Sequence, residues 1–239
     1  MPTFEDACEY FSDRRSSQRI AYLPQYANDK ILESLMQMGF RRSGQYFYQK
    51  TCDLCQECVG LRIPLQDFQL SQSQKRLLKK NASLEVSILQ PQETDYKTEL
   101  YLEYQKKTHL DTDSLWNNHE LEKMLQTMRQ QVYTHPNSSR ELCVSLNGNI
   151  LGVILLDIVG SSVSAVYSFY DPAHKQKSLG TYLVLQSLLW ATKEKIEYFY
   201  MGLYLQGHKK MNYKNRFRPY ETLNIGDSKW KKACVEKEG

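Results

Sequence analysis

A run of three apolar segments in the second half of the 239-residue chain limits its possible folds more than any other feature. Residues 142–146 and 150–159 read as strands, and Asn147-Gly148 between them is the strongest short signal for a tight hairpin. A third apolar segment, 163–170, follows the turn at 160–162. The sequence therefore predicts a three-stranded meander at the centre of the fold.

The segments on either side of this meander complete a known order of elements. A strand at 84–89 and helices at 96–108 and 119–133 precede it, and a helix at 178–195 and a strand at 198–203 follow it. This α+β order is that of the GCN5-related N-acetyltransferase fold, a mixed sheet in which an acyl donor lies where the central strands part. Because one fold hosts many functions, the order predicts an architecture and leaves the reaction open.

The first part of the chain contains a separate set of elements. An amphipathic helix at 28–39 is followed by strands at 45–50 and 59–65 and by a short basic helix or turn at 71–80. The chain length allows two unequal domains, since domains typically run about 100 to 200 residues. We therefore expect a smaller N-terminal domain over residues 1–82 and an acetyltransferase-like domain over residues 83–239.

Composition and the start of the sequence bear on where the protein works. With 41% apolar and 24% charged residues, the chain can bury a sizeable core, which excludes a disordered protein. The longest apolar run of note, 150–156, is far shorter than the roughly 18 to 20 residues that cross a bilayer, so we expect no membrane span. The first six residues carry the acidic pair Glu5 and Asp6 where a signal peptide is basic and then apolar, and we expect a cytoplasmic protein.

Basic side chains gather in two places although the formal net charge is only +4. The segment 209–219 interleaves cations with two aromatic residues, a pattern expected where phosphates are neutralised and a base is stacked. The residues that we expect to bind a nucleic acid are Lys75, Arg76, Lys79, Lys80, Lys210, Tyr213, Lys214, Arg216 and Arg218. The alternative is a solvated basic face with Tyr213 and Phe217 in the core.

The turn after the third meander strand bears on coenzyme A as a donor. In acetyltransferases of this fold, a turn of the form Gln/Arg-x-x-Gly-x-Gly/Ala holds the pyrophosphate of the coenzyme at a helix N-terminus. Residues 177–182 keep only the first glycine, Gly180, and place the bulky Tyr182 where a small residue lets phosphates approach. A coenzyme A donor is therefore disfavoured, and Gly180 has two interpretations, close helix packing or a ligand role.

Three of the six cysteines have a spacing that suits metal ligands. Cys52, Cys55 and Cys58 are separated by two residues each, so three thiols can point at one zinc ion or iron–sulfur cluster, which commonly takes four protein ligands. Spacing shows no fourth ligand, although Cys8 is a candidate. The alternative is a loop of free cysteines beside a strand.

Several blocks in combination resemble the bacterial aminoacyl-tRNA–protein transferases, in their leucyl-transferring branch. In the first domain they are 38–44, the stretch Cys52-x-x-Cys55-x-x-Cys58 with 59–64 after it, and 71–81. In the second domain they are 165–174, 178–182 and 210–219. The resemblance runs from about residue 22 to residue 219 and covers most of the chain. One departure is Ile20, which stands where the family has the cysteine of a Cys-Ser-Tyr-Leu-Pro motif.

The resemblance implies a reaction and its partners. Members move an amino acid, leucine in this branch and arginine in eukaryotic relatives, from an aminoacyl-tRNA to the N-terminal amine of a protein that begins with Asp or Glu. This marks the protein for degradation by the N-end rule. The donor is already an activated ester, so neither ATP nor coenzyme A is required. The alternatives are an arginyl-tRNA–protein transferase with the same acceptors and a non-catalytic tRNA- or RNA-binding protein.

Asp171 comes at the end of the third meander strand, where this fold opens its sheet. We expect Asp171 to accept a proton from the acceptor amine or to orient that amine. Tyr170 or His174 can then pass a proton to the departing ribose oxygen. The alternative for Asp171 is a capping role in the Asp171-Pro172 turn.

The acidic first residue of an acceptor needs a cation to recognise it. Arg41, Arg42 and Arg62 in the N-terminal domain are the candidates, because a guanidinium binds a carboxylate through two parallel hydrogen bonds. The leucine of the donor needs an apolar slot without a buried carboxylate, whereas arginine would need one.

Overall fold

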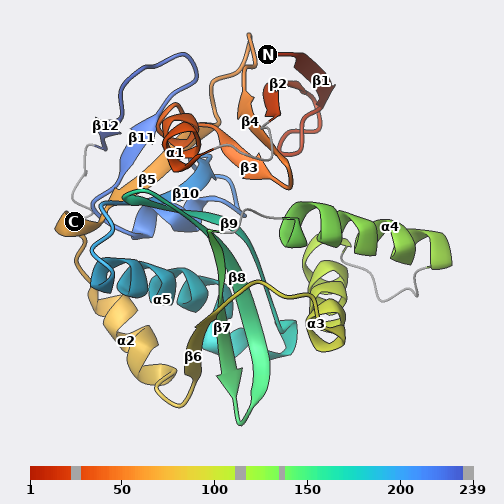
Figure 1. Cartoon of the computed structure of the whole chain (residues 1–239), viewed down its shortest axis with the longest axis vertical. Coiled ribbons are helices and arrows are strands. Elements are labelled where there is room, and N and C mark those ends of the chain that lie inside the picture. Colours follow the sequence, from red (N-terminus) through yellow and green to blue (C-terminus); the bar gives the residue numbers. More distant parts are fainter. Residues whose placement is uncertain (23–27, 111–116, 135–137, 234–239) are drawn as a thin grey trace.

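The computed structural model describes residues 1–22, 28–110, 117–134 and 138–233, and these form a small sheet and a large one (Figure 1). The small sheet has the strand order β1-β2-β4-β3, with antiparallel neighbours throughout. Its strands are β1 (Thr3–Ala7), β2 (Arg15–Tyr22), β3 (Arg41–Ser43) and β4 (Tyr46–Lys50). Helix α1 (Asp29–Gln37), capped by the Asn28 side chain, buries its apolar face between this sheet and the large one.

Eight strands form the large sheet in the order β12-β11-β5-β10-β9-β8-β7-β6. All neighbours are antiparallel except β9 and β10, which run parallel. The strands are β5 (Val59–Pro64), β6 (Glu85–Leu89), β7 (Ser139–Leu146), β8 (Asn149–Val159), β9 (Ser162–Tyr170), β10 (Tyr198–Tyr204), β11 (Glu221–Leu223) and β12 (Lys231–Lys232). The GCN5-related N-acetyltransferase-like mixed sheet expected from the sequence is confirmed.

The predicted meander is strands β7, β8 and β9. Asn147 and Gly148 both have positive φ, 51° and 81°, as a two-residue hairpin of the favoured twist requires. Strand β8 is apolar along nearly its whole length because both faces of the sheet are covered. Ile154 belongs to the core cluster on one face and Val153 to the cluster on the other, as the two-residue period of a strand dictates.

Helices cover both faces of the large sheet (Figure 1). Helix α5 (Leu179–Lys193) fills one face, with α2 (Gln72–Lys80) beside it. Helix α3 (Asp95–Gln105) covers the other face together with the turn that follows α4 (Asn118–Met128). The expected helices 96–108 and 119–133 both end in π-helical turns, η2 (Lys106–Leu110) and η3 (Arg129–Tyr133). Short 3₁₀ turns are η1 (Leu65–Asp67), η4 (Pro172–Lys177) and η5 (Asn212–Arg216). Within the described ranges, every helix is too short or too polar to cross a bilayer.

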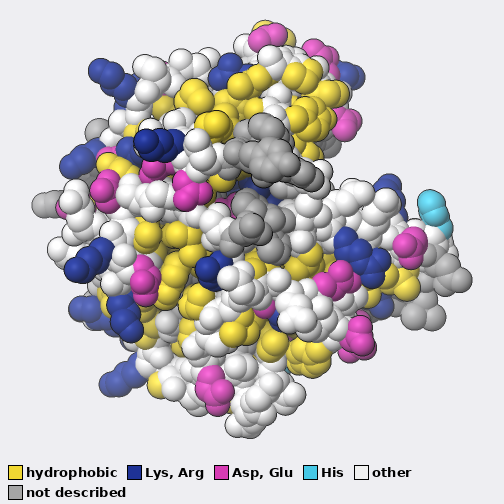
Figure 2. Space-filling model, in the orientation of Figure 1, with side chains coloured by type: hydrophobic (Ala, Val, Ile, Leu, Met, Phe, Trp, Pro, Cys, Tyr) yellow, Lys and Arg dark blue, Asp and Glu magenta, His cyan; other side chains and the backbone are white. Residues whose placement is uncertain are grey.

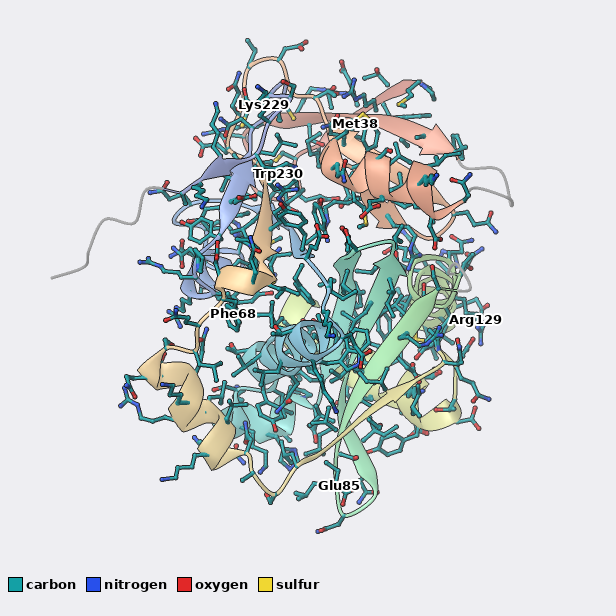
Figure 3. All side chains as sticks on the ribbon, turned by 60° about the vertical axis from the view of Figure 1, so that its left-hand side comes forward. Met38, Phe68, Glu85, Arg129, Lys229 and Trp230 are labelled. Carbon is teal, nitrogen blue, oxygen red and sulfur yellow. The ribbon has the colours of Figure 1, made fainter. Side chains whose placement is uncertain are left out.

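Three polar contacts tie the small sheet and α1 to the large sheet. Arg42 on β3 forms an ion pair with Asp157 on β8, and the two side chains are only 2% and 3% exposed. The Glu33 carboxylate on α1 accepts hydrogen bonds from the backbone N–H and the hydroxyl of Ser161. Trp230, which lies beside α1 in Figure 3, donates from its indole nitrogen to the last carbonyl of that helix at 2.8 Å.

Residues 1–82 contribute to both sheets. Strands β1 to β4 make up the small sheet, whereas β5 pairs with β10 and α2 packs beside α5. The boundary between residues 82 and 83 stays a prediction, and the strand pairing shows that the first 82 residues also complete the large sheet.

Candidate active site

The central strands β9 and β10 part after a short parallel ladder. They pair only from Tyr198 opposite Ser162 to Tyr200 opposite Ser164. An irregularity in β10 between Tyr200 and Gly202 then shifts its register against β5, while β9 continues to Tyr170. This is the parting of strands that the sequence predicted, and a pocket opens there, lined in part by Arg41, Ser164, Tyr200, Gly202 and Leu203.

The Arg41 guanidinium lies directly against the backbone of Gly202. Gly202 has φ +78°, and a Cβ atom placed on it would lie 2.3 Å from Arg41 Cζ. Both the left-handed backbone and the close approach therefore require glycine here. In the part of the chain that the structure describes, Arg41 forms no ion pair with a carboxylate. Arg41 thus offers an unpaired cation where the strands part.

The other two arginines predicted to bind the acceptor are engaged elsewhere. Arg42 Nη2 donates to Asp157 Oδ1 at 3.1 Å inside the core, out of reach of solvent. Arg62 Nη2 lies 2.7 Å from Glu221 Oε2, and its guanidinium lies 3.9 Å from the centre of the Tyr198 ring. These two side chains stabilise the sheets. Of the three arginines predicted to bind the acceptor carboxylate, Arg41 is therefore the one that remains available.

Lys214 lies in the predicted nucleic-acid segment but points into the protein. Its Nζ donates to the Leu203 carbonyl at 2.6 Å, and the residue is only 6% exposed. Burial, and then the nearby Arg41 charge, lower the pKa of this amine well below its usual value. A buried amine of this kind does not neutralise a phosphate at the surface, so the placement of Lys214 contradicts that prediction. Phe217 is also buried, as the alternative interpretation of the segment expected.

Asp171 holds His174 at the C-terminal end of β9. Asp171 Oδ1 accepts from the N–H of Ala173 at 2.7 Å, which is the capping role considered from the sequence. Asp171 Oδ2 lies 2.7 Å from His174 Nδ1, and both side chains remain partly exposed, at 26% and 30%. In a neutral imidazole, a carboxylate at Nδ1 favours the tautomer that carries its proton on that nitrogen, with Nε2 as the acceptor. Asp171 therefore both caps the turn and orients a base.

Tyr170, the last residue of β9, directly precedes Asp171. A Cβ atom on Gly180 would lie 2.8 Å from the Tyr170 ring, so Gly180 serves close packing between β9 and the start of α5. Burial raises the pKa of Tyr170, which stays a protonated hydroxyl at neutral pH. Burial also raises the pKa of Tyr213, on which Arg41 and Tyr170 both act electrostatically. Tyr170, Tyr213 and Arg41 are thus close enough to influence one another electrostatically, and Tyr170 is followed directly by Asp171, which holds His174.

The three closely spaced cysteines lie near one another and near Cys8. Burial raises the pKa of the Cys58 thiol to about 12, and Cys52, Cys8 and Cys55 add to this rise. Cys52 Sγ accepts from the Ser17 N–H and Cys55 Sγ from Arg14, each at 3.3 Å. Among the described residues no group of three His, Cys, Asp or Glu is arranged to hold a metal ion, and we derive no step through one.

The outer face of α2 is strongly basic. Its four cations are exposed, and Figure 2 shows Lys and Arg side chains gathered on the side of the molecule where α2 lies. They are Lys75, Arg76, Lys79 and Lys80. At its start the buried Gln74 donates to the Arg216 carbonyl, and at its end Asn81 donates to the Lys177 carbonyl at 2.8 Å. The basic helix is thereby fixed to both the 209–219 segment and the turn before α5.

Lys210 and Arg216 are exposed in the second basic segment, whereas Arg218 and Tyr213 are half-buried. Arg218 Nε donates to the Asn215 carbonyl at 3.1 Å, which fixes part of its side chain.

Sequence reasoning missed Gly202 and the Leu203 carbonyl as parts of the site. A glycine inside the apolar run 198–205 is a signal for a bulge or a close backbone approach, and it could have pointed to this position.

A pair of glycine substitutions tests how Arg41 is held. We expect Gly202→Ala to raise the KM for an acceptor that Arg41 binds by about tenfold or more, because the new methyl group displaces the guanidinium. Gly207→Ala is the matched control, since Gly207 also has positive φ, +73°, but has no atom within 4 Å of a new Cβ. Steady-state kinetics of both variants measure the effect, and equal KM values would contradict this placement of Arg41.

A mixed sheet whose central strands part beside Arg41, with the Asp171–His174 pair at the end of β9, has the architecture of the acetyltransferase-like class. Residues 6–76 and 96–224 match the family models described as arginine-tRNA-protein transferase, N terminus and C terminus. The chain belongs to this family of aminoacyl-tRNA–protein transferases.

Two relatives and one solved structure show how far the similarity extends. A protein of Leptospira interrogans named aspartate/glutamate leucyltransferase is 36% identical over 215 residues, covering 90% of this chain and 82% of the relative. One of the same name from Stutzerimonas stutzeri is 34% identical over 223 residues, covering 91% and 90%. The C-terminal domain of a putative lysylphosphatidylglycerol synthetase from Agrobacterium fabrum shares the fold, with a TM-score of 0.51 at 12% identity, over 82% of this chain and 64% of that one.

Proposed function

We propose that the protein transfers leucine from leucyl-tRNA to the N-terminal amine of proteins that begin with Asp or Glu, and so marks them for degradation. The observation that carries this is the similarity along nine-tenths of the chain to relatives named aspartate/glutamate leucyltransferase. The unpaired Arg41 where β9 and β10 part supports an acidic acceptor. A reaction that consumes aminoacyl-tRNA belongs in the cytoplasm.

The donor ester is already activated, so catalysis consists of placing a neutral amine against the ester carbonyl. The amine nitrogen attacks the carbonyl carbon, the C–N bond forms, and the bond from that carbon to the ribose oxygen breaks. An α-amine has a pKa of about 7.7 to 8.0, so the base has modest work and positioning supplies most of the rate.

The oriented histidine supplies the proton transfers. His174 Nε2 takes the proton that the attacking amine loses, and Asp171 stabilises the imidazolium that forms. The departing ribose oxygen receives a proton from the His174 imidazolium, either directly or through the Tyr170 hydroxyl, which gives up its own proton and takes the one from His174. Arg41 holds the acceptor side chain, and so fixes the amine beside it.

A substitution of Asp171 separates its charge from its capping role. Asp171→Asn keeps an oxygen for the Ala173 N–H but no longer stabilises a charged His174, so we expect kcat to fall about a hundredfold with little change in KM. Asp227→Asn is the control, since Asp227 also accepts hydrogen bonds at a turn, from Lys231 and Asn224. Single-turnover transfer rates decide the matter, and an unchanged rate for Asp171→Asn would remove Asp171 from the mechanism.

The tRNA binds across α2 and the exposed cations of the 209–219 segment in this proposal. Replacing both Lys79 and Lys80 with glutamate should raise the KM for leucyl-tRNA and lower the slope of log KM against log salt by about one for each phosphate that α2 no longer neutralises. Lys30→Glu is the control, since Lys30 is an exposed lysine on α1. An unchanged salt slope in the double variant would show that the tRNA does not lie across α2.

The function itself is tested by transfer of labelled leucine and labelled arginine, each from its charged tRNA, onto reporters that begin with Asp, Glu, Lys or Ala. Leucine on the Asp and Glu reporters alone is the expected result. Arginine in its place would keep the reaction class and change the donor. No transfer from either tRNA, with charged-tRNA controls active, would favour a non-catalytic RNA-binding protein.

A further inference from the structure

Lys214 is a buried amine without a negative partner. Its Nζ reaches one carbonyl oxygen, that of Leu203, and within the described residues no carboxylate pairs with it. A charged amine in such a place has lost its water and gained only a single hydrogen bond, so the neutral form is favoured.

Lys214 and Arg41 meet on consecutive residues of β10. Arg41 lies against Gly202 and Lys214 bonds to Leu203, although they come from β3 and η5, which are distant in sequence. This point lies just beyond the last paired residues of β9 and β10, where the backbones of the two strands no longer pair with each other. Two basic groups therefore lie against neighbouring residues of β10, Arg41 lines the pocket there, and among the described residues Arg41 is the charged group that shifts the pKa of Lys214.

Arg41 is the charged group that acts on Lys214. Among the described residues, Arg41 acts electrostatically on Tyr10, in the loop after β1, and on Tyr213 in η5, and Tyr48 on β4 lies opposite it in the small sheet. Burial raises the pKa of Tyr10 and Tyr213, so they are neutral hydroxyls at physiological pH and do not offset the guanidinium charge.

A carboxylate that binds Arg41 would shift Lys214 from its neutral to its protonated form, because an opposite charge close to an amine favours the charged state. We propose that Lys214 is neutral in the free protein and takes up a proton when the carboxylate of an acidic N-terminal residue binds Arg41, so that two cations hold the bound side chain. This inference rests on the proposed function, since it concerns the same acceptor. Lys214 is then a specificity-determining residue, because it strengthens the binding of acceptors that begin with Asp or Glu relative to those that begin with Asn or Gln.

The sign of the pH dependence follows from the direction of proton movement. Because binding takes up a proton, the Kd for an acidic acceptor should rise as pH rises through the range in which the free Lys214 is neutral. The α-amine of the acceptor also titrates near this range, but it does so equally in a peptide that begins with Asn. The difference between the Asp and Asn peptides therefore isolates the side-chain effect.

The test is calorimetric binding of an Asp-starting and an Asn-starting peptide in two buffers of different ionisation enthalpy, phosphate and Tris. For the Asp peptide we expect uptake of about one more proton by the wild-type protein than by Lys214→Met. The variant should bind this peptide about tenfold or more weakly, because it lacks the second cation. Equal proton uptake by the two proteins would overturn the proposal while leaving the leucyl-transfer function standing.

A second measurement serves if Lys214→Met does not fold. In the wild-type protein, log Kd for the Asp peptide should rise more steeply with pH than log Kd for the Asn peptide, by up to about one per pH unit. Parallel pH profiles would refute proton uptake by Lys214. Failure of the wild-type protein to bind the Asp peptide at all would overturn the acceptor assignment itself, which is a different outcome from binding without proton uptake.

Discussion

Replacing Arg41 with alanine is expected to lower kcat/KM for an Asp-starting acceptor by roughly two orders of magnitude or more, because the side-chain carboxylate loses its charged partner in a partly buried pocket. Transfer to a reporter should be measured at saturating leucyl-tRNA, so that the loss reports on the acceptor alone. Arg41→Lys should recover only part of the activity, since an ammonium cannot form the two parallel hydrogen bonds of a guanidinium.

Arg19→Ala is the matched control for Arg41→Ala. Arg19 is an exposed arginine of the same small sheet, bonded to Gln49 and lying over the Phe40 ring, and it does not line the pocket. It should leave kcat/KM near the wild-type value. If Arg41→Ala behaves like Arg19→Ala, the acceptor carboxylate binds elsewhere and the site described above is wrong in its acceptor half.

Arg42→Ala should lower the free energy of unfolding by about 3 to 5 kcal/mol, because it leaves Asp157 buried without a counter-charge. The Ser139 hydroxyl, 2.6 Å from Asp157 Oδ1, compensates only in part. Urea unfolding followed by circular dichroism measures the change. The exposed pair of Arg15 and Glu5 provides the comparison, and Arg15→Ala should cost less than about 1 kcal/mol.

A double variant shows whether the stability depends on the buried ion pair itself or is lost only when one charge remains without its partner. Arg42→Met combined with Asp157→Leu removes both charges and should recover much of the stability, since well-packed apolar residues often replace a buried ion pair without loss. A midpoint for Arg42→Ala close to that of Arg15→Ala would mean that the two sheets do not depend on this pair.

The sequence predicted the elements whose patterns are local and strong. The Asn147-Gly148 hairpin, the meander and the long α5 helix were all expected, since turn chemistry and apolar period specify them directly. Strands β1, β2, β3, β11 and β12 were not expected. All except β2 have five residues or fewer, and pairing with other strands rather than their own pattern makes them strands.

For the candidate site, the sequence indicated which residues to consider but not which of them contact one another. Tyr170, Asp171 and His174 follow one another in the chain, so their proximity was visible in the sequence. Nothing local distinguishes Arg41 from Arg42, because the deciding ion pair joins residues 115 positions apart. Lys214 sits among exposed cations in sequence, and only the fold shows that its amine points inward to Leu203.

The central claim is that donor and acceptor meet where β9 and β10 part. The most direct measurement is a crystal structure of the protein with an Asp-starting peptide and a non-hydrolysable 3′-leucylamido-adenosine. We predict that the peptide carboxylate lies about 2.7 to 2.9 Å from the Arg41 guanidinium, with the peptide amine between His174 and the leucyl carbonyl. A peptide bound away from this gap, with Arg41 left unpaired, would contradict the account.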